Sequence, residues 1–209
     1  MKMTRKLDEY RSAQAHWSWL LAADQLTESG HELFFGAAQQ KTKYDLAEQE
    51  AERRASLRHE QQPDIAAVEQ VECEPPRFLP AFLLYGYGIE DLLKGLYVRR
   101  NPGAIDADRV NIPTHHDLNN LAEAANYPPS REETELMTKL TTITTWSGRY
   151  PVAKTRFQHG GTGLVREAIF DDPVAAGLAC QALIKSLRQL VDDPSESRPK
   201  GGAVVVWSD

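Results

Sequence analysis

Cysteine is scarce in this chain of 209 residues, which contains only Cys73 and Cys180. Two cysteines without a paired spacing exclude a disulfide framework and a cysteine-based zinc finger, so we expect a reducing, cytoplasmic location. The amino-terminal residues MKMTRKLDEYRSAQ lack the apolar core of a secretory signal. The longest apolar run meets Glu90 and Asp91 before it is long enough to cross a bilayer. We therefore expect no membrane partner.

Strand patterns are also nearly absent, because apolar residues recur three or four positions apart rather than at alternate positions. The net charge of −6 shows no overall preference for nucleic acid or anionic membranes. A hydrophobic fraction of 41% is ordinary for a globular protein. The length favours one domain with an added helical arm. We expect an all-α bundle of about six helices.

The most apolar helical pattern covers residues 78–100, FLPAFLLYGYGIEDLLKGLYVRR. Phe82, Ile89 and Leu93 lie on a wide apolar face, which is typical of a central helix covered on more than one side. Glu90 and Lys94 stand four residues apart at the edge of that face. Two interpretations are open: an exposed salt bridge on the flank of the helix, or a half-buried pair that faces a cleft.

The amino-terminal third predicts two helices. Residues 7–26 repeat apolar residues on one face, and Gly30 would end or turn that helix. Residues 31–62 lack proline and become polar, which predicts a long, solvated helical arm. We therefore divide the chain into amino-terminal helices with a polar arm (1–62), a bundle core (63–194) and a flexible tail (195–209).

Helix-start signals organise the remainder of the chain. Thr114 with Asp117 resembles a capping box, and Ser130 with Glu133 is a clearer one. Asp172 followed by proline predicts the start of the last helix. The helix after Ser130 carries four apolar residues on one face and would end at Gly148; these four are Leu136, Leu140, Ile143 and Trp146.

A basic window lies between residues 136 and 166, where the chain has no Asp or Glu. It holds five cations and three aromatic residues: Lys139, Arg149, Lys154, Arg156, Arg166, Trp146, Tyr150 and Phe157. One interpretation is a local positive patch with stacking groups for phosphates and unstacked bases. The other is a chance gap in acidic residues, with Trp146 and Tyr150 in the core.

Two short motifs carry candidate chemistry. His115-His116-Asp117 stands at a helix start, where a histidine could act as an acid or base or bind an anion. The alternative is a capping cluster with one exposed histidine. We find no further His and Asp ligands of a metal-dependent HD phosphohydrolase, so we expect no metal. In the WSGRYP turn, Arg149 presents a planar fork suited to phosphate, or it pairs with Glu90 or Asp117 inside the bundle.

Three segments together resemble a bacterial branch of the HEPN (higher eukaryotes and prokaryotes nucleotide-binding) families: YGYGIEDLLKGLYV, HHDLNNLAEAA and WSGRYPV. The resemblance spans about residues 78–154 and leaves out the first 70 residues and the tail. It implies a HEPN-like helical bundle with an extended amino-terminal arm. It also implies Glu90, Lys94, His116 and Arg149 as site residues.

The resemblance implies an RNA- or nucleotide-directed protein, either a metal-independent ribonuclease without a cofactor or a toxin–antitoxin or antiphage-defence component. His116 and Arg149 would be catalytic, and Glu90 would orient one of the phosphate-holding cations. The remaining predicted binding residues are Lys94, Asp117, Trp146, Tyr150, Lys154 and Arg156. The implied partners are a second copy of the chain in a homodimer, RNA or a nucleotide, and a nucleotidyltransferase or antitoxin-like protein.

The alternative is a non-catalytic helical module that binds another protein or itself. HEPN ribonucleases carry an arginine followed four to six residues later by histidine at the start of a late helix. None of the candidate pairs in this chain falls on the last predicted helix; they are Arg11 with His16, Arg53 or Arg54 with His59, and Arg109 with His115 or His116. The polar arm at residues 31–62 also favours an interaction role.

Overall fold

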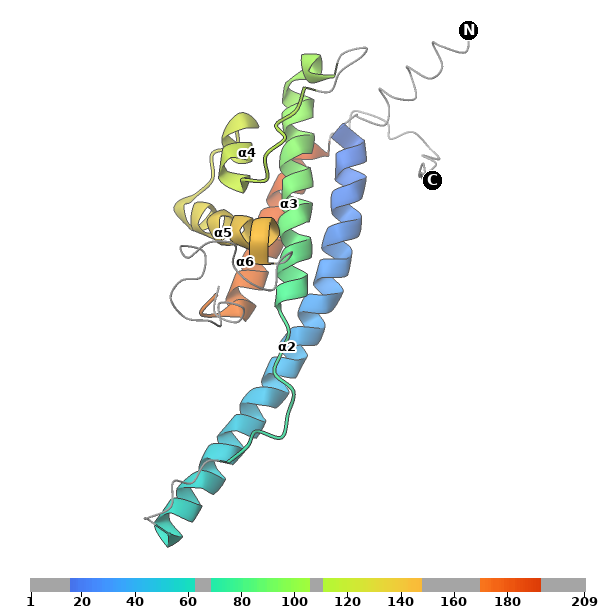
Figure 1. Cartoon of the computed structure of the whole chain (residues 1–209). Helices are drawn as coiled ribbons and strands as arrows, with labels where there is room; N and C mark the ends of the chain where they lie inside the picture. Colours follow the sequence, from blue (N-terminus) through green and yellow to red (C-terminus); the bar gives the residue numbers. More distant parts are fainter. Residues whose placement is uncertain (1–15, 63–68, 106–110, 148–169, 193–209) are drawn as a thin grey trace.

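The computed structural model describes residues 16–62, 69–105, 111–147 and 170–192. These residues form an all-α helical bundle without a strand, which confirms the predicted fold class (Figure 1). The elements are α2 (His16–Gln61), α3 (Leu79–Arg100), the 3-10 turn η1 (Pro102–Ala104), α4 (Leu118–Ala124), α5 (Arg131–Thr142), the π-helical turn η2 (Ile143–Ser147) and α6 (Pro173–Val191). Within the described residues, every helix is too short or too polar to cross a membrane.

Helix α3 lies at the centre of the bundle and contacts α2, α4, α5 and α6. Of its 22 residues, 13 are buried. A helix that is apolar around most of its circumference can bury that surface only when other helices cover it on several sides. The predicted central helix is therefore confirmed.

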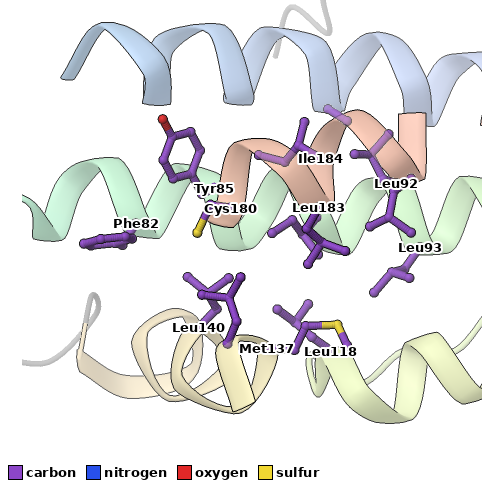
Figure 2. Close-up of a cluster of buried hydrophobic side chains, with 14 of the residues drawn as sticks. Phe82, Tyr85, Leu92, Leu93, Leu118, Met137, Leu140, Cys180, Leu183 and Ile184 are labelled. Atoms are coloured by element: carbon purple, nitrogen blue, oxygen red, sulfur yellow. The ribbon is translucent and has the colours of Figure 1, made fainter. Parts of the chain in front are cut away.

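The hydrophobic core forms where the other helices meet α3. Figure 2 shows Phe82, Tyr85 and Leu93 of α3 beside side chains from three further helices. These partners are Leu118 of α4, Met137 and Leu140 of α5, and Cys180, Leu183 and Ile184 of α6. Each is buried, so the three later helices are held mainly by apolar contact with α3.

Helix α2 is a single helix of 46 residues, and the predicted end or turn at Gly30 is wrong. Gly30 is buried, and a Cβ atom there would stand 3.0 Å from the Tyr85 ring. The glycine therefore permits close packing against α3 and does not stop the helix. Upstream of the arm, α2 contributes Leu20 and Phe34 to the common core.

The second half of α2 extends beyond the other helices as an arm (Figure 1). A strap, residues 69–77, runs back along this arm toward α3. The Gln40 side-chain amide donates to the Glu74 carbonyl at 2.8 Å, and Arg58 pairs with Glu69 at 2.6 Å. These polar contacts hold the strap on one side of the arm.

Side chains cap the amino-terminal ends of the three shorter α-helices, α4, α5 and α6. Ser130 and Glu133 form the predicted capping box, and Asp172 caps α6 as expected. Helix α4 differs from the prediction because Asp117 caps it alone. Its Oδ1 atom accepts from the backbone N–H groups of Asn119 and Asn120 at 3.0 and 3.1 Å.

Candidate functional site

The candidate site begins with a carboxylate buried in the middle of α3. The Glu90 side chain is only 7% exposed, and its Oε1 atom lies 2.6 Å from Nζ of Lys94, which is 11% exposed. The spacing of four residues on a helix brings the two side chains together. The pair is therefore buried, and the alternative of an exposed flank salt bridge is excluded.

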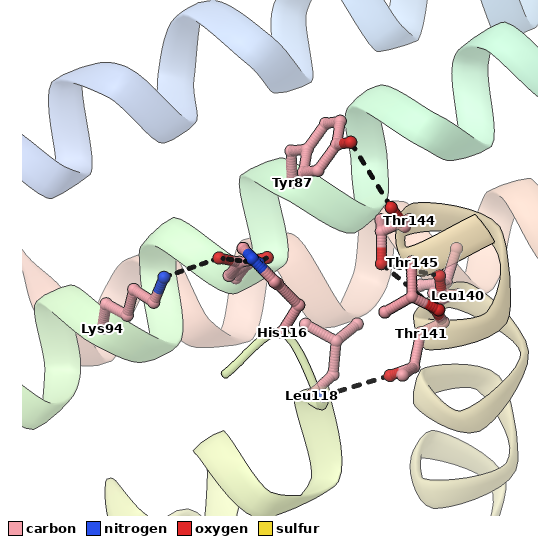
Figure 3. A network of polar contacts seen from close by, with 9 residues as sticks. Tyr87, Lys94, His116, Leu118, Leu140, Thr141, Thr144 and Thr145 are labelled. Carbon is pink, nitrogen blue, oxygen red and sulfur yellow. Dashed lines mark hydrogen bonds and ion pairs between the residues drawn. The ribbon is translucent and has the colours of Figure 1, made fainter. Parts of the chain in front are cut away.

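His116 reaches the same carboxylate from the loop before α4. Its Nδ1 atom lies 2.9 Å from Oε1 and 3.1 Å from Oε2 of Glu90 (Figure 3). An ionised carboxylate can only accept hydrogen bonds, so Nδ1 carries the proton and donates it. The ring is 43% exposed. No described residue binds its other nitrogen, Nε2, which is therefore open to a ligand.

The route of the loop explains why His116 arrives at Glu90. Asp117 starts α4, Leu118 is buried in the core, and the Leu118 N–H donates to the Thr141 hydroxyl of α5 at 3.1 Å (Figure 3). These contacts fix the backbone immediately after His116. Asp117 uses its carboxylate on the α4 backbone.

Two further residues adjoin the Lys94–Glu90 pair. The Lys94 Nζ atom lies 5.9 Å from the centre of the Trp19 ring, which places an aromatic face of α2 beside the ammonium group. The pKa of Asp91 is raised to about 6, mainly by burial and also by the negative charge of Glu90, while Lys94 acts in the opposite direction. Two neighbouring carboxylates, those of Glu90 and Asp91, thus lie in a largely buried part of α3.

Sequence reasoning missed both of these residues. Asp91 carried a usable signal, because it follows Glu90 directly within the most apolar helix. Trp19 carried none, since only the packing of α2 on α3 places it near Lys94.

The structure brings together three predicted site residues, which we call the Glu90 cluster: Glu90, Lys94 and His116. Asp117 is next to the cluster in sequence but serves as a helix cap. Trp146 belongs to η2, but its side chain lies outside the described part of the structure. Four predicted residues also lie outside it: Arg149, Tyr150, Lys154 and Arg156.

The Glu90 cluster suits proton transfer. A histidine whose Nδ1 is held by a carboxylate presents Nε2 in a defined direction, as either an acid or a base. Among the residues that the structure describes, no three His, Cys, Asp or Glu side chains gather as metal ligands.

No protein-family model, curated protein or solved structure matches this chain. The HEPN likeness therefore remains a resemblance between motifs. The geometry of the Glu90 cluster is the feature of the molecule that points to a function.

Proposed function

We propose that this chain is a HEPN-like protein that acts on RNA, with His116 as the acid–base group of a metal-independent ribonuclease. One observation carries the proposal: a buried carboxylate holds Nδ1 of a half-exposed histidine, and Nε2 is left open. In an ordinary surface histidine, nothing fixes the ring. Here Glu90 orients it, which is the arrangement that general acid–base catalysis requires.

The reaction would follow from proton transfer at Nε2. His116 would accept the proton of a ribose 2′-hydroxyl as the 2′ oxygen forms a bond to the adjacent phosphorus. The bond from phosphorus to the 5′ oxygen would break, that oxygen would take a proton from water, and His116 would release the proton it accepted to the solvent. The products would be a 2′,3′-cyclic phosphate and a free 5′-hydroxyl, with neither oxidant nor metal consumed.

Lys94 is better suited to hold Glu90 than to hold the substrate. Its side chain is 11% exposed, and its ammonium already lies 2.6 Å from Glu90. We therefore propose that Glu90 and Lys94 position the His116 ring. We propose that residues of the basic window bind the phosphate, with Arg149 as the first candidate. Water-poor surroundings strengthen the Lys94–Glu90 interaction and keep the carboxylate in place.

The test is incubation of the pure full-length chain with cellular RNA in EDTA. We expect cleavage to cyclic phosphate ends, and we expect His116→Ala to slow it by about 100-fold or more. His115→Ala is the matched control, because His115 is the exposed neighbour and is outside the Glu90 cluster. An inactive wild-type chain, or equal rates for the two variants, would refute the ribonuclease.

Glu90→Gln tests the positioning role, since Gln keeps the shape but removes the charge. We expect a lower kcat with little change in KM, together with a changed pH profile of kcat. Circular dichroism of the folded variant is the necessary control. An unchanged pH profile would mean that Glu90 stabilises the fold but does not position His116 for catalysis.

A second candidate function is that of a non-catalytic interaction module. The arm favours it, because most of its side chains are exposed and it extends beyond the bundle (Figure 1). Its partner would be a nucleotidyltransferase or antitoxin-like protein in toxin–antitoxin or antiphage defence. Co-purification of such a partner from the native host, lost when residues 40–61 are replaced by an unrelated helix, would support this role. Co-purification of the partner with the replaced chain would show that the arm is not the binding surface.

A further inference from the structure

Helix α2 presents the Trp19 ring to the buried ammonium group of Lys94. The Nζ atom of Lys94 lies 5.9 Å from the centre of that ring, which is within the range over which an aromatic face attracts a cation. The same ammonium lies 2.6 Å from Glu90, and the Lys94 side chain is 11% exposed. The attraction is stronger where water is scarce. Trp19 therefore adds a favourable contact to the cation that holds Glu90.

The close packing of α2 on α3 sets the place of this ring. Gly95 follows Lys94 on α3. A Cβ atom at Gly95 would stand 3.0 Å from Cβ of Trp19 and 3.3 Å from Cγ1 of Val191 on α6. A larger residue would push the helices apart at this level. Because a glycine is next to Lys94, α2 comes close enough for the Trp19 ring to reach the ammonium.

The indole nitrogen of Trp19 favours an electrostatic role over simple space filling. Trp19 Nε1 is buried, and it has no hydrogen-bond partner among the residues that the structure describes. A buried donor without a partner costs free energy, and phenylalanine would fill space there without such a donor. Tryptophan, however, has the aromatic face that attracts a cation most strongly. The residue therefore suits a site beside an ammonium group.

We propose that Trp19 is a positioning residue of the Glu90 cluster, which acts through Lys94 on the charge that Glu90 presents to His116. Lys94 and His116 contact the same atom, Glu90 Oε1, at 2.6 and 2.9 Å (Figure 3). A firmly held Lys94 offsets the carboxylate charge, so a protonated His116 ring is stabilised less. An acid–base histidine needs this balance, because it must release its proton as readily as it accepts one.

The titratable groups around Lys94 come from α3 and from the loop before α4. Glu90 and Asp91 belong to α3, and the pKa of Asp91 responds to the Lys94 charge. His116 belongs to the loop, whereas α2 contributes the uncharged Trp19 ring. A substitution of Trp19 by an apolar residue changes no formal charge. Its effect on His116 must therefore pass through the position of Lys94.

The first test follows the His116 ring by NMR over a series of pH values, in the full chain and without RNA. The His116 resonances are assigned by their loss in His116→Ala. We expect them to titrate at a higher pH in Trp19→Leu than in the wild-type chain, with Trp19→Phe between the two. Trp17→Leu is the matched control, because residues two apart on a helix point about 200° away from each other. We expect no shift in the control.

The second test measures cleavage of RNA in EDTA, and this catalytic effect rests on the proposed ribonuclease activity. We expect Trp19→Leu to lower kcat at neutral pH by about three- to tenfold with little change in KM, as one lost cation–π contact predicts. The difference from the wild-type rate should shrink as pH rises. Gly95→Ala should act in the same direction, because it displaces the Trp19 ring without altering it.

An unchanged His116 titration in a folded Trp19→Leu chain would overturn the proposal, because it would show that the ring only fills space. An equal shift in Trp17→Leu would overturn it as well. Circular dichroism shows which variants fold, and Trp19→Phe with Gly95→Ala decides the question if Trp19→Leu does not. A wild-type chain that leaves RNA intact would refute the ribonuclease, whereas the NMR titration would still decide the role of Trp19.

Discussion

The middle of α3 and the arm of α2 each contain an acidic residue followed by a basic one within about one helical turn, but the two ion pairs differ in burial. Glu90 and Lys94 are 7% and 11% exposed, whereas Glu50 and Arg53 on the arm are 46% and 62% exposed. Both pairs have short contacts, at 2.6 and 2.7 Å. Water screens the arm pair but not the α3 pair. Contact distance alone therefore does not reveal what an ion pair contributes.

The same contrast between buried and exposed positions holds for two glycines, one in the bundle and one on the exposed face of α2. A Cβ atom at Gly177 of α6 would overlap the Phe34 ring, whereas a Cβ atom at Gly36 of α2 would meet nothing within 4 Å. In the bundle, packed neighbours limit the side-chain volume that a position can accept. On the exposed face of α2, no neighbour limits that volume. Four changes would break or sharpen this contrast.

The largest effect is expected for Lys94→Met, which leaves the buried Glu90 with His116 as its remaining partner. We expect the free energy of unfolding to fall by about 3 to 5 kcal/mol. Arg53→Met on the arm should leave it nearly unchanged, because water screens the exposed pair. Urea denaturation followed by circular dichroism measures both. Equal losses would show that burial does not separate the two pairs.

Gly177→Ala comes next, because the added methyl group would force the Phe34 ring or α6 to move. We expect a loss of about 2 to 3 kcal/mol in the free energy of unfolding. Gly36→Ala should instead raise the free energy of unfolding by about 0.5 to 1 kcal/mol, since alanine favours the helix and has room there. Thermal melts of the two variants check the difference. A stable Gly177→Ala chain would contradict the close contact.

Asp91 makes the bundle sensitive to pH. Its pKa rises from an ordinary 3.8 to about 6 in the folded chain, mainly through burial. The folded state therefore binds this proton more tightly than the unfolded state does. The resulting stabilisation is full below about pH 4 and is lost as pH rises through about 6. Asp91→Asn should raise the free energy of unfolding at pH 7 by about 1 to 2 kcal/mol and flatten this dependence.

The matched control for Asp91→Asn is Asp45→Asn on the arm. Its carboxylate is 42% exposed and pairs with Lys41, so we expect little change at any pH. Urea denaturation at a series of pH values measures both variants. A flat wild-type profile between pH 4 and 7 would contradict the role given to Asp91.

The smallest effect is expected at the start of α5. Ser130→Ala removes the hydroxyl that accepts from the Glu133 N–H at 3.2 Å, and this should cost about 1 kcal/mol. Ser56→Ala on the arm is the control, because its hydroxyl bonds only within an exposed helix. Denaturant midpoints compare the two. Equal midpoints would mean that the cap of α5 contributes nothing.

Local signals in the sequence predicted much of the fold. The apolar pattern of residues 78–100 predicted α3, and Ser130 with Glu133 and Asp172 predicted two helix starts, because these features act within one or two turns. Gly30 was misinterpreted because a glycine that ends a helix and a glycine that admits a neighbouring ring look the same in sequence.

The candidate site was predictable only in part. Glu90 and Lys94 are close because they share a helix, but the pattern did not say whether they were buried. His116 lies 26 residues from Glu90, and its contact depends on the course of the loop into α4. Asp117 caps α4 as its place at a helix start suggested, because its carboxylate accepts from backbone N–H groups there.

The sequence by itself determined that this chain is helical, which helix is central and where several helices begin, since each of these properties follows from contacts between near neighbours. Only the tertiary structure decided that Glu90 is buried, that it holds His116, and that one face of α2 is covered while the other is exposed. Burial and long-range contact depend on how helices pack together. No local pattern contains that information.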